Sequence, residues 1–258
     1  MDIVCRSGIQ VTGEGARTVH DDIIVEDHVR LFLNGECLAA LVASPDRLDD
    51  LAAGFVVCEG LADTVSSVNV SGKDVYVTAP LGRDVRLEME SSGGYRVLGE
   101  PRKVTSSITV TAETIRAVTA AIESDTWRRT GGVHCSVLFC DGKLVTRACD
   151  VGRHNTVDKV VGYATLRGID RSTCILGCTG RQPAGMVAKA ANAGIPIVIS
   201  RAASTDRGIL TAEQAGLTLV CFSRGERFTI YTHPERVPDI LAAVKKAQPG
   251  QRTVTRTH

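Results

Sequence analysis

The first hundred residues alternate between apolar and polar positions in short runs. Residues 22–43 carry this pattern on both sides of Asn34-Gly35, a pair typical of a two-residue hairpin turn. Residues 48–61 instead place apolar side chains at helical spacing, with Ser44 as the expected N-cap. Short alternating segments return over residues 64–98, separated by Gly, Pro, Asp and Ser. The pattern predicts a β-rich unit with one helix.

The hydrophobic pattern changes in the second half of the chain, where stretches with helical periodicity alternate with short apolar runs. The periodicity predicts helices over 111–123, 154–166, 183–193, 210–215 and 234–247. The apolar runs predict a hairpin over 133–149 that turns at Asp141-Gly142, and strands over 172–180, 195–200, 217–223 and 226–233. Hairpins supply antiparallel pairs and helical crossovers supply parallel ones, so we predict an α/β fold with a mixed sheet.

The two patterns suggest a division into domains. We predict a β-rich N-terminal subdomain with one helix over residues 1–104 and an α/β ligand-binding domain over residues 105–248. Residues 249–258 are polar and are expected to form a flexible tail.

Composition excludes several classes of protein. A chain of 258 residues can bury a sizeable core without disulfides or metals. Its formal net charge of +1 provides no bulk field for nucleic acid or an acidic membrane, so any anionic ligand must be held by local arginines. The sequence has no membrane-spanning apolar run and no apolar block at its N-terminus. We therefore expect a cytoplasmic protein that binds neither nucleic acid nor membrane.

The nine cysteines form an odd-numbered set in a chain without an export signal, which favours reduced thiols over a disulfide framework. No C-x-x-C occurs, so the usual zinc-ribbon and thioredoxin signals are missing. A zinc-dependent deaminase also needs H-x-E, which is absent around His134. No metal of the protein's own is expected.

The stretch TGGVHC, residues 130–135, raises a question about chemistry. Alternation along a strand places Cys135 on an apolar face and Cys140 on the opposite one. His134 lies on the mixed face behind Gly131 and Gly132, where a ligand could approach the backbone closely. Cys135 can be a strand filler or a reactive thiol, and His134 can bind a ligand or a neighbouring carbonyl. The sequence leaves both choices open.

Two turns combine glycine with arginine at the start of a predicted helix. Arg153 and His154 follow one strand, and Gly180 and Arg181 follow another. Free N–H groups at a helix start and a guanidinium together can form an anion-binding site. A helix N-cap exposed to solvent would explain the same residues. Three further polar residues flank the first of these turns, and we expect them to lie outside the core: Asp150, Asn155 and Asp158.

Cys178 ends an apolar strand just before the second of these turns. Ligands collect at the carboxyl edge of strands in open α/β sheets. A thiol next to a helix N-terminus and Arg181 is expected to have a lowered pKa, so Cys178 is a candidate nucleophile. A structural role for this cysteine remains the alternative.

A third turn with arginine and glycine joins the last two predicted strands. It could recognise a purine edge and a phosphate together, and ordinary hairpin solvation is the alternative; its residues are Phe222, Ser223, Arg224, Gly225, Glu226 and Arg227. Three such turns in one α/β unit predict a nucleotide or another polyanion as ligand.

Long ordered stretches of the chain resemble the FdhD-type formate dehydrogenase accessory proteins. They include LFLNGECLAALVASPDRLDDLAAGFVVCEGL, then TGGVHCSVLFCDGKLVTRACDVGRHNTVDKVVGYA, then CTGR with KAANAGIPIVIS, and LTLVCFSRGERFTIYTH. They cover most of residues 30–232, and TGGVH followed by DVGRHN is the most specific part.

The resemblance implies a cytidine-deaminase-like α/β/α core with a mixed sheet and a β-rich N-terminal subdomain. Members of this family are sulfur carriers. They receive sulfur as a persulfide from a cysteine desulfurase and pass it to the molybdenum bis(guanine dinucleotide) cofactor of formate dehydrogenase. The family's cofactor-binding segment matches Phe222 to Arg227. The resemblance also makes a homodimer plausible.

One departure from the family concerns its reactive cysteines. The family carries a C-x-x-C after two serines, whereas here Ile108 and Thr111 follow Ser106-Ser107 at those positions. Either Cys178 or Cys135 carries the sulfur as a sulfurtransferase, with His134 nearby, or the protein is a cofactor-binding and insertion chaperone without persulfide chemistry.

Overall fold

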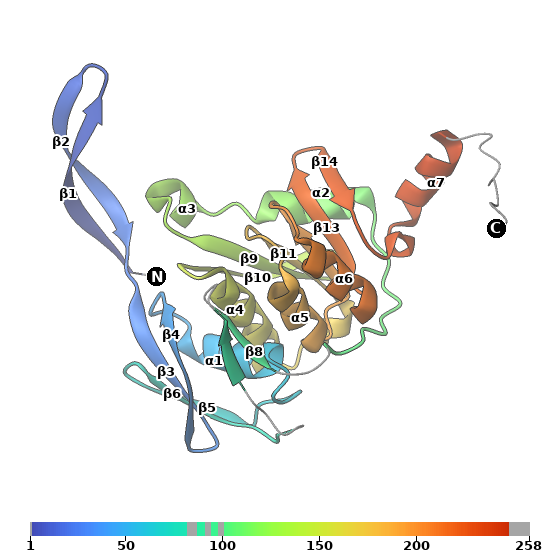
Figure 1. The fold of residues 1–258 in the computed structure, drawn as a ribbon, viewed down its shortest axis with the longest axis horizontal. Helices are drawn as coiled ribbons and strands as arrows, with labels where there is room; N and C mark the ends of the chain where they lie inside the picture. The colour runs from blue at the N-terminus through green and yellow to red at the C-terminus, as the bar shows by residue number, and fades with distance from the viewer. Residues whose placement is uncertain (1, 82–86, 91–93, 98–100, 248–258) are drawn as a thin grey trace.

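A six-stranded mixed sheet forms the centre of the computed structural model, which describes residues 2–81, 87–90, 94–97 and 101–247 (Figure 1). The strand order is β10-β9-β11-β12-β13-β14. The bounds are β9 His134–Cys140, β10 Lys143–Asp150, β11 Cys174–Cys178, β12 Ile197–Ser200, β13 Thr218–Arg224 and β14 Arg227–Ile230. Strands β11, β12 and β13 are parallel and the other neighbours are antiparallel, which confirms the predicted mixed sheet.

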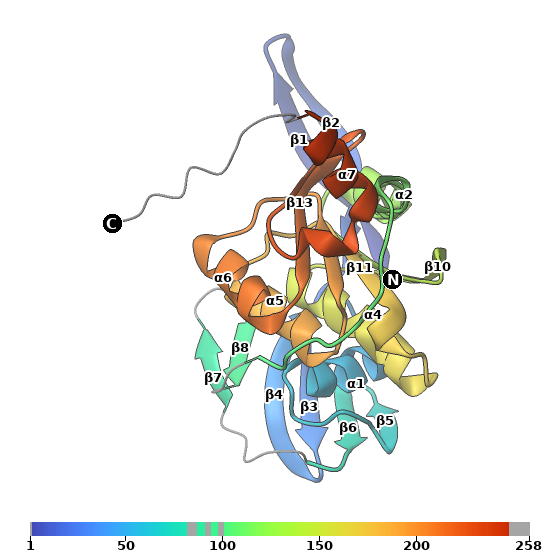
Figure 2. The same ribbon diagram turned by 90° about the vertical axis from the view of Figure 1, so that its right-hand side faces the viewer.

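Helices cover both faces of this sheet. One face packs against α4 Arg153–Leu166, α5 Ala184–Asn192 and α6 Asp206–Ala215, and the other against α2 Ala112–Ala121 and the start of α7 Pro238–Ala247. Figure 2 shows α5 and α6 on one side of β13, and α2 and α7 on the other. The turns η1 Arg171–Thr173 and η2 Pro234–Arg236 precede β11 and α7. This α/β/α layering agrees with the prediction.

A second sheet, of order β4-β3-β6-β5, forms the N-terminal part. It comprises β3 Asp27–Leu33, β4 Glu36–Ala43, β5 Ser67–Ser71 and β6 Asp74–Thr78, and α1 Leu48–Cys58 covers it. The hairpin turns at Asn34-Gly35 as predicted, with φ of 51° and 92°. Strands β7 Leu87–Glu90 and β8 Gly94–Val97 pair, whereas the rest of 82–100 and the predicted tail lie outside the described residues. The domain boundaries stay predictions.

Helix α1 crosses α4 at two glycines. A Cβ atom on Gly54 would overlap the carbonyl oxygen of Asp158, and one on Gly162 would overlap that of Asp50. Only glycine at both positions lets the two backbones lie this close. The helix that covers the N-terminal sheet is therefore in direct backbone contact with a helix of the central core.

Helix α1 begins later than predicted, because Ser44 has other partners. The N-cap is Arg47, with φ of 53° and no side-chain cap bond. The Ser44 amide donates to Asp150 at 3.1 Å, and its carbonyl accepts from Lys159 Nζ at 3.1 Å. The prediction of Ser44 as N-cap is wrong, because these contacts hold its backbone outside the helix.

Two elements were not predicted. A hairpin of β1 Ile3–Thr12 and β2 Gly15–Ile24 projects from the body, with Ile9 and Val11 about three-quarters exposed (Figure 1). The short helix α3 Asp125–Thr130 precedes β9. Within the described ranges, every helix is too short or too polar to cross a lipid bilayer.

The expectation of reduced thiols throughout is wrong at one pair, since Cys140 and Cys174 form a disulfide. The two residues are directly opposite in the antiparallel pair of β9 and β11, with Cα atoms 4.4 Å apart. That register brings the sulfurs together, which the cysteine count could not reveal. The seven other cysteines are free.

Candidate ligand-binding site

A cavity of about 650 Å³ opens where β11, β12 and β13 end, next to the start of β9. The carboxyl edge of parallel strands is where the sequence predicted a ligand. The volume lies within the range of small-molecule sites. The lining residues come from α2, α3 and these strand ends: Ile122, Glu123, Ser124, Trp127, Gly131, Gly132, Val133, His134, Cys135, Thr179, Arg201 and Arg224.

The TGGVH segment forms one wall of this cavity. Gly131 ends α3 with φ of 62°, a conformation that favours glycine, and its amide donates to the Trp127 carbonyl. Gly132 is exposed, and a Cβ atom there would come within 3.0 Å of Ile24. The structure therefore brings Gly131, Gly132 and His134 to one surface, as the sequence predicted.

His134 is half-buried at the start of β9, where it lines the cavity. Its Nδ1 lies 3.1 Å from the Thr179 hydroxyl, which also accepts the Cys135 amide at 3.1 Å. Burial and the charge of Arg153 lower the pKa of His134, against a smaller opposing effect of Asp150. His134 is therefore neutral near pH 7 and can donate to a ligand or accept a proton from it.

The Arg153 and Arg181 turns lie side by side. A Cβ atom on Gly180 would come within 3.0 Å of the Arg153 Cβ. Burial and the charge of Arg181 lower the pKa of Arg153, which remains a cation at any physiological pH. Two guanidinium groups on adjacent turns beside His134 produce a positive potential suited to an anion.

His154 faces inward from the first turn of α4. Burial, aided by the charges of Lys189 and Arg153, lowers the pKa of this side chain to about 3. Among the described residues, neither of its ring nitrogens has a hydrogen-bond partner. The His154 side chain is therefore a neutral ring packed beneath the turn that presents Arg153.

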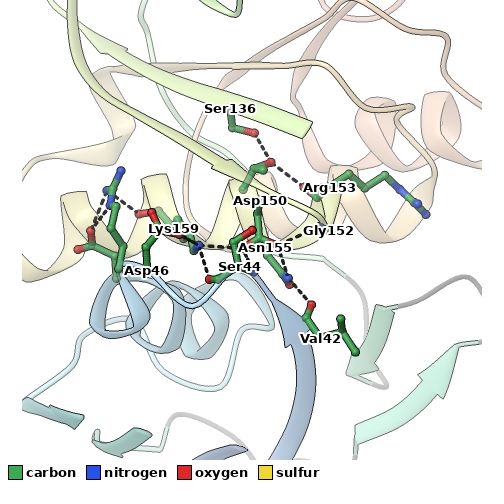
Figure 3. Close-up of polar contacts among 12 residues, drawn as sticks. Val42, Ser44, Asp46, Ser136, Asp150, Gly152, Arg153, Asn155 and Lys159 are labelled. Atoms are coloured by element: carbon green, nitrogen blue, oxygen red, sulfur yellow. Dashed lines mark hydrogen bonds and ion pairs between the residues drawn. The ribbon is translucent and has the colours of Figure 1, made fainter. Parts of the chain in front are cut away.

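A buried polar network fixes the turn between β10 and α4 (Figure 3). Asp150 accepts hydrogen bonds from the Gly152 amide at 2.9 Å and the Asn155 side chain at 2.8 Å. It also forms an ion pair of 2.8 Å with Lys159, and Asn155 donates to the Val42 carbonyl. These contacts anchor the segment that presents Arg153.

The prediction that the polar residues around this turn avoid the core is wrong. Asp150, Asn155 and Asp158 are all buried. Each is compensated, and both carboxylate oxygens of Asp158 accept from Lys189 Nζ at 2.9 Å. Burial raises the pKa of Asp158 to about 6 despite the Lys189 charge. Paired charges can be buried where single ones cannot.

Cys178 does not have the lowered pKa expected of it. It is fully buried, and its Sγ accepts from the Gln182 side chain at 3.0 Å. Burial raises the pKa of this thiol to about 12. Desolvation outweighs the nearby helix start and Arg181, because Arg181 extends to solvent.

Cys135 is buried on the apolar face, as the strand pattern predicted, and it has an unpredicted neighbour. Val137 and Phe139 share that face in one core, whereas Leu138 packs in the other core. Directly opposite Cys135 on β10 lies Cys149, which is half-buried. Cys149 was not predicted as a site residue.

The turn between β13 and β14 is only partly in the cavity. Arg224 lines it and donates to the Arg201 carbonyl at 3.1 Å. Ser223 is buried against Thr119 on α2. The other members point elsewhere or lie beside the cavity: Glu226 pairs with Arg116 at 2.7 Å, and Arg227 lies 6.0 Å over the Phe222 ring.

Trp127 was not predicted as a site residue. Trp127 lies on α3 in the cavity wall, and its side chain is 55% exposed. Large aromatic side chains are rarely left this open without a partner. Its signal in the sequence is weak, because the six-residue helix that presents it has no detectable period.

Thr111, one of the two positions at which the resemblance implies a cysteine, is remote from the cavity. Thr111 caps the N-terminus of α2, whereas the cavity begins after its C-terminus, about 15 Å away by the helical rise. Ile108 packs against the core on the α2 side. In the part of the chain that the structure describes, no three His, Cys, Asp or Glu side chains are grouped as metal ligands.

Comparison with known proteins gives consistent matches. The model of the FdhD/NarQ family matches residues 24–238. The sulfur carrier protein FdhD of Methanothermobacter thermautotrophicus is 35% identical over 235 residues, which cover 86% of this chain and 93% of the relative. The sulfur carrier protein FdhD of Wolinella succinogenes is 36% identical over 246 residues, which cover 88% and 85%.

A solved structure has the same fold. The crystal structure of a candidate formate dehydrogenase accessory protein from Desulfotalea psychrophila superposes with a TM-score of 0.78 at 25% identity. The superposition covers 91% of this chain and 99% of that one. The two chains therefore share their architecture over nearly their whole lengths.

Proposed function

Because the chain belongs to the FdhD/NarQ family, we propose that it is an accessory protein of formate dehydrogenase that binds the molybdenum bis(guanine dinucleotide) cofactor in the cavity. The observation that carries the proposal is the convergence of His134, Arg224 and Trp127 at one sheet edge, beside the paired Arg153 and Arg181 turns. Such a set suits a ligand with a purine and phosphates.

The arginines and Trp127 have distinct roles in this proposal. Arg224 and Arg201 line the cavity and can bind phosphate oxygens, as can the Arg153 and Arg181 turns beside it. The exposed Trp127 ring offers a surface on which guanine can stack, an interaction of about 1–3 kcal/mol per base. The cavity holds one end of a dinucleotide, and the rest lies along the sheet edge.

The sulfur donor in this proposal is a cysteine desulfurase, and the acceptor is the cofactor destined for formate dehydrogenase. The names of the curated relatives, which are sulfur carrier proteins, support this role. It requires a thiol other than those of the missing C-x-x-C. A homodimer and a cytoplasmic location remain part of the proposal.

The alternative is a cofactor-binding and insertion chaperone without a covalent step. It is favoured by the burial of Cys178 and Cys135 and by the raised pKa of both thiols. Alkylation of all accessible thiols then leaves cofactor binding unchanged and also leaves formate dehydrogenase fully matured. Loss of maturation after alkylation rejects this alternative.

Calorimetric titration of the full chain with GDP and with ADP tests the binding site. We expect GDP to bind and ADP to bind more weakly, and Trp127→Ala to weaken GDP binding. An absence of GDP binding, or equal affinity for the two nucleotides, contradicts the proposal. Formate dehydrogenase activity in cells with and without this chain then tests the accessory role.

A further inference from the structure

Cys135 and Cys149 are directly opposite each other in the β9–β10 hairpin. Both backbone groups of Cys135 point away from β10, since its amide donates to the Thr179 hydroxyl at 3.1 Å and its carbonyl accepts from the Thr179 amide at 3.0 Å. The two cysteines are therefore a non-hydrogen-bonded pair, in which Cα atoms lie about 4.5 Å apart and side chains are close. In the same sheet, the directly opposite cysteines Cys140 and Cys174, with Cα atoms 4.4 Å apart, do form a disulfide.

A β-bulge creates this pairing. Near the turn Cys140 faces Lys143 and Phe139 faces Leu144, but the register shifts by one residue between Leu144 and Thr146. Without the shift, the residue opposite Cys135 would be Ala148. The extra residue in β10 thus places two thiols together next to the cavity, which Cys135 lines.

Cys149 is half-buried, whereas Cys135 is buried, so Cys149 is the thiol of the pair that a sulfur donor reaches more easily. The hydrogen bond with Cys135, together with Ser124 and the Arg147 charge, lowers the pKa of Cys149 to about 6, against the effects of burial and Asp46. The same bond and burial raise the pKa of Cys135. Arg147 is held over this face by two hydrogen bonds to the Ala121 carbonyl, of 2.8 and 3.1 Å.

We propose that Cys149 is the sulfur-carrying nucleophile of this protein and Cys135 its resolving thiol. The proposal rests on the sulfur-carrier function proposed above. It assigns the chemistry to a cross-strand pair at the cavity, in a chain whose sequence contains no C-x-x-C.

The loading step transfers one sulfur atom without net oxidation. The Cys149 thiolate attacks the outer sulfur of a donor persulfide, R–S–SH. A bond forms between Cys149 Sγ and that sulfur, while the donor S–S bond breaks and the donor leaves as a thiolate. The products are Cys149–S–SH and R–S⁻.

The release step uses the neighbouring thiol. Cys135 attacks Cys149 Sγ in the persulfide anion, forming the Cys135–Cys149 disulfide and expelling the outer sulfur as HS⁻, which takes the Cys135 proton. The outer sulfur is reduced to sulfide and the two thiols are oxidised. A cellular dithiol reductant then restores both thiols.

The test exposes the full chain to glutathione persulfide and locates the added sulfur atom by intact mass and peptide mapping. The expected adduct is on Cys149 and is lost in Cys149→Ser and Cys149→Ala. In Cys135→Ser the adduct accumulates and sulfide release is lost. Cys178→Ser and the exposed-cysteine control Cys37→Ser behave as the wild type.

A second measurement needs no variant. The alkylation rate of Cys149 in the wild-type protein is expected to reach half its maximum near pH 6. Sulfur on a different cysteine, or no adduct in Cys135→Ser while GDP still binds, overturns the assignment and leaves the cofactor-binding function standing. Failure of the wild type to bind GDP rejects that function instead, whatever the outcome of sulfur loading.

Discussion

Asp150 and Lys159 form an ion pair of 2.8 Å in which neither side chain is exposed. Removing the lysine leaves a buried carboxylate whose remaining partners are neutral. We expect Lys159→Met to lower the free energy of unfolding by about 3–5 kcal/mol, measured by urea denaturation. The matched control is Arg30→Met, which breaks the exposed pair with Asp74 and is expected to change stability little. Equal effects of the two substitutions contradict the prediction.

Arg224→Ala is expected to weaken GDP binding roughly ten- to hundredfold, because a charge-assisted contact contributes about 1.5–3 kcal/mol. Arg227→Ala should have the smaller effect, because Arg227 does not line the cavity. Titration calorimetry checks both, with the exposed Arg207→Ala on α6 as control. An Arg224 variant that binds as the wild type does removes this arginine from the site.

His154 should make stability depend on pH. Its pKa is about 3 in the folded protein and near 6.5 in the unfolded chain, so the unfolded state binds more protons below pH 6.5. Its contribution to stability is therefore complete above that pH and is lost as the pH falls toward 3, by at most about 1.4 kcal/mol per pH unit. Urea denaturation at several pH values should show a flatter profile for His154→Gln. The exposed control His20→Gln should parallel the wild type, and a His154→Gln profile that does so instead refutes the prediction.

The Cys140–Cys174 disulfide closes a loop across a sequence separation of 34 residues. By the chain-entropy relation, such a closure stabilises the folded state by about 3–4 kcal/mol. Cys174→Ser should show this loss in urea denaturation without reductant, and the difference should shrink when dithiothreitol is added to both proteins. Cys37→Ser serves as control, and an unchanged difference with reductant would falsify the prediction.

The parts of the fold that were predicted have strong local signals. Asn34-Gly35 and Asp141-Gly142 both adopt the positive φ angles that their residue types favour, and the hairpins turn there. The β1–β2 hairpin was missed because most of its residues are exposed on both faces, so no buried period exists to detect. Helix α3, with six residues, is too short for a periodic signal.

The site was predicted only as far as local sequence specifies it. Gly131, Gly132, His134 and Arg224 could be identified because each lies at the end of a predicted strand. Cys149 could not, because its partner depends on the bulge in β10, and a two-residue turn alone predicts a different register. The raised pKa of Cys178 depends on tertiary burial, which outweighs the local helix start that the sequence displays.

The glycine crossing of α1 and α4 has a mechanical consequence. Helix α4 starts at the arginine turn, and Gly162, past its midpoint, lies against the backbone of the helix that covers the other sheet. The core that α1 forms with the N-terminal sheet and the core that α4 forms with the central sheet cannot move relative to each other without breaking this contact. Heating or denaturant should therefore unfold both cores in a single transition. A force applied to the N-terminal sheet is transmitted along helix α4 to the ligand-facing edge of the central sheet.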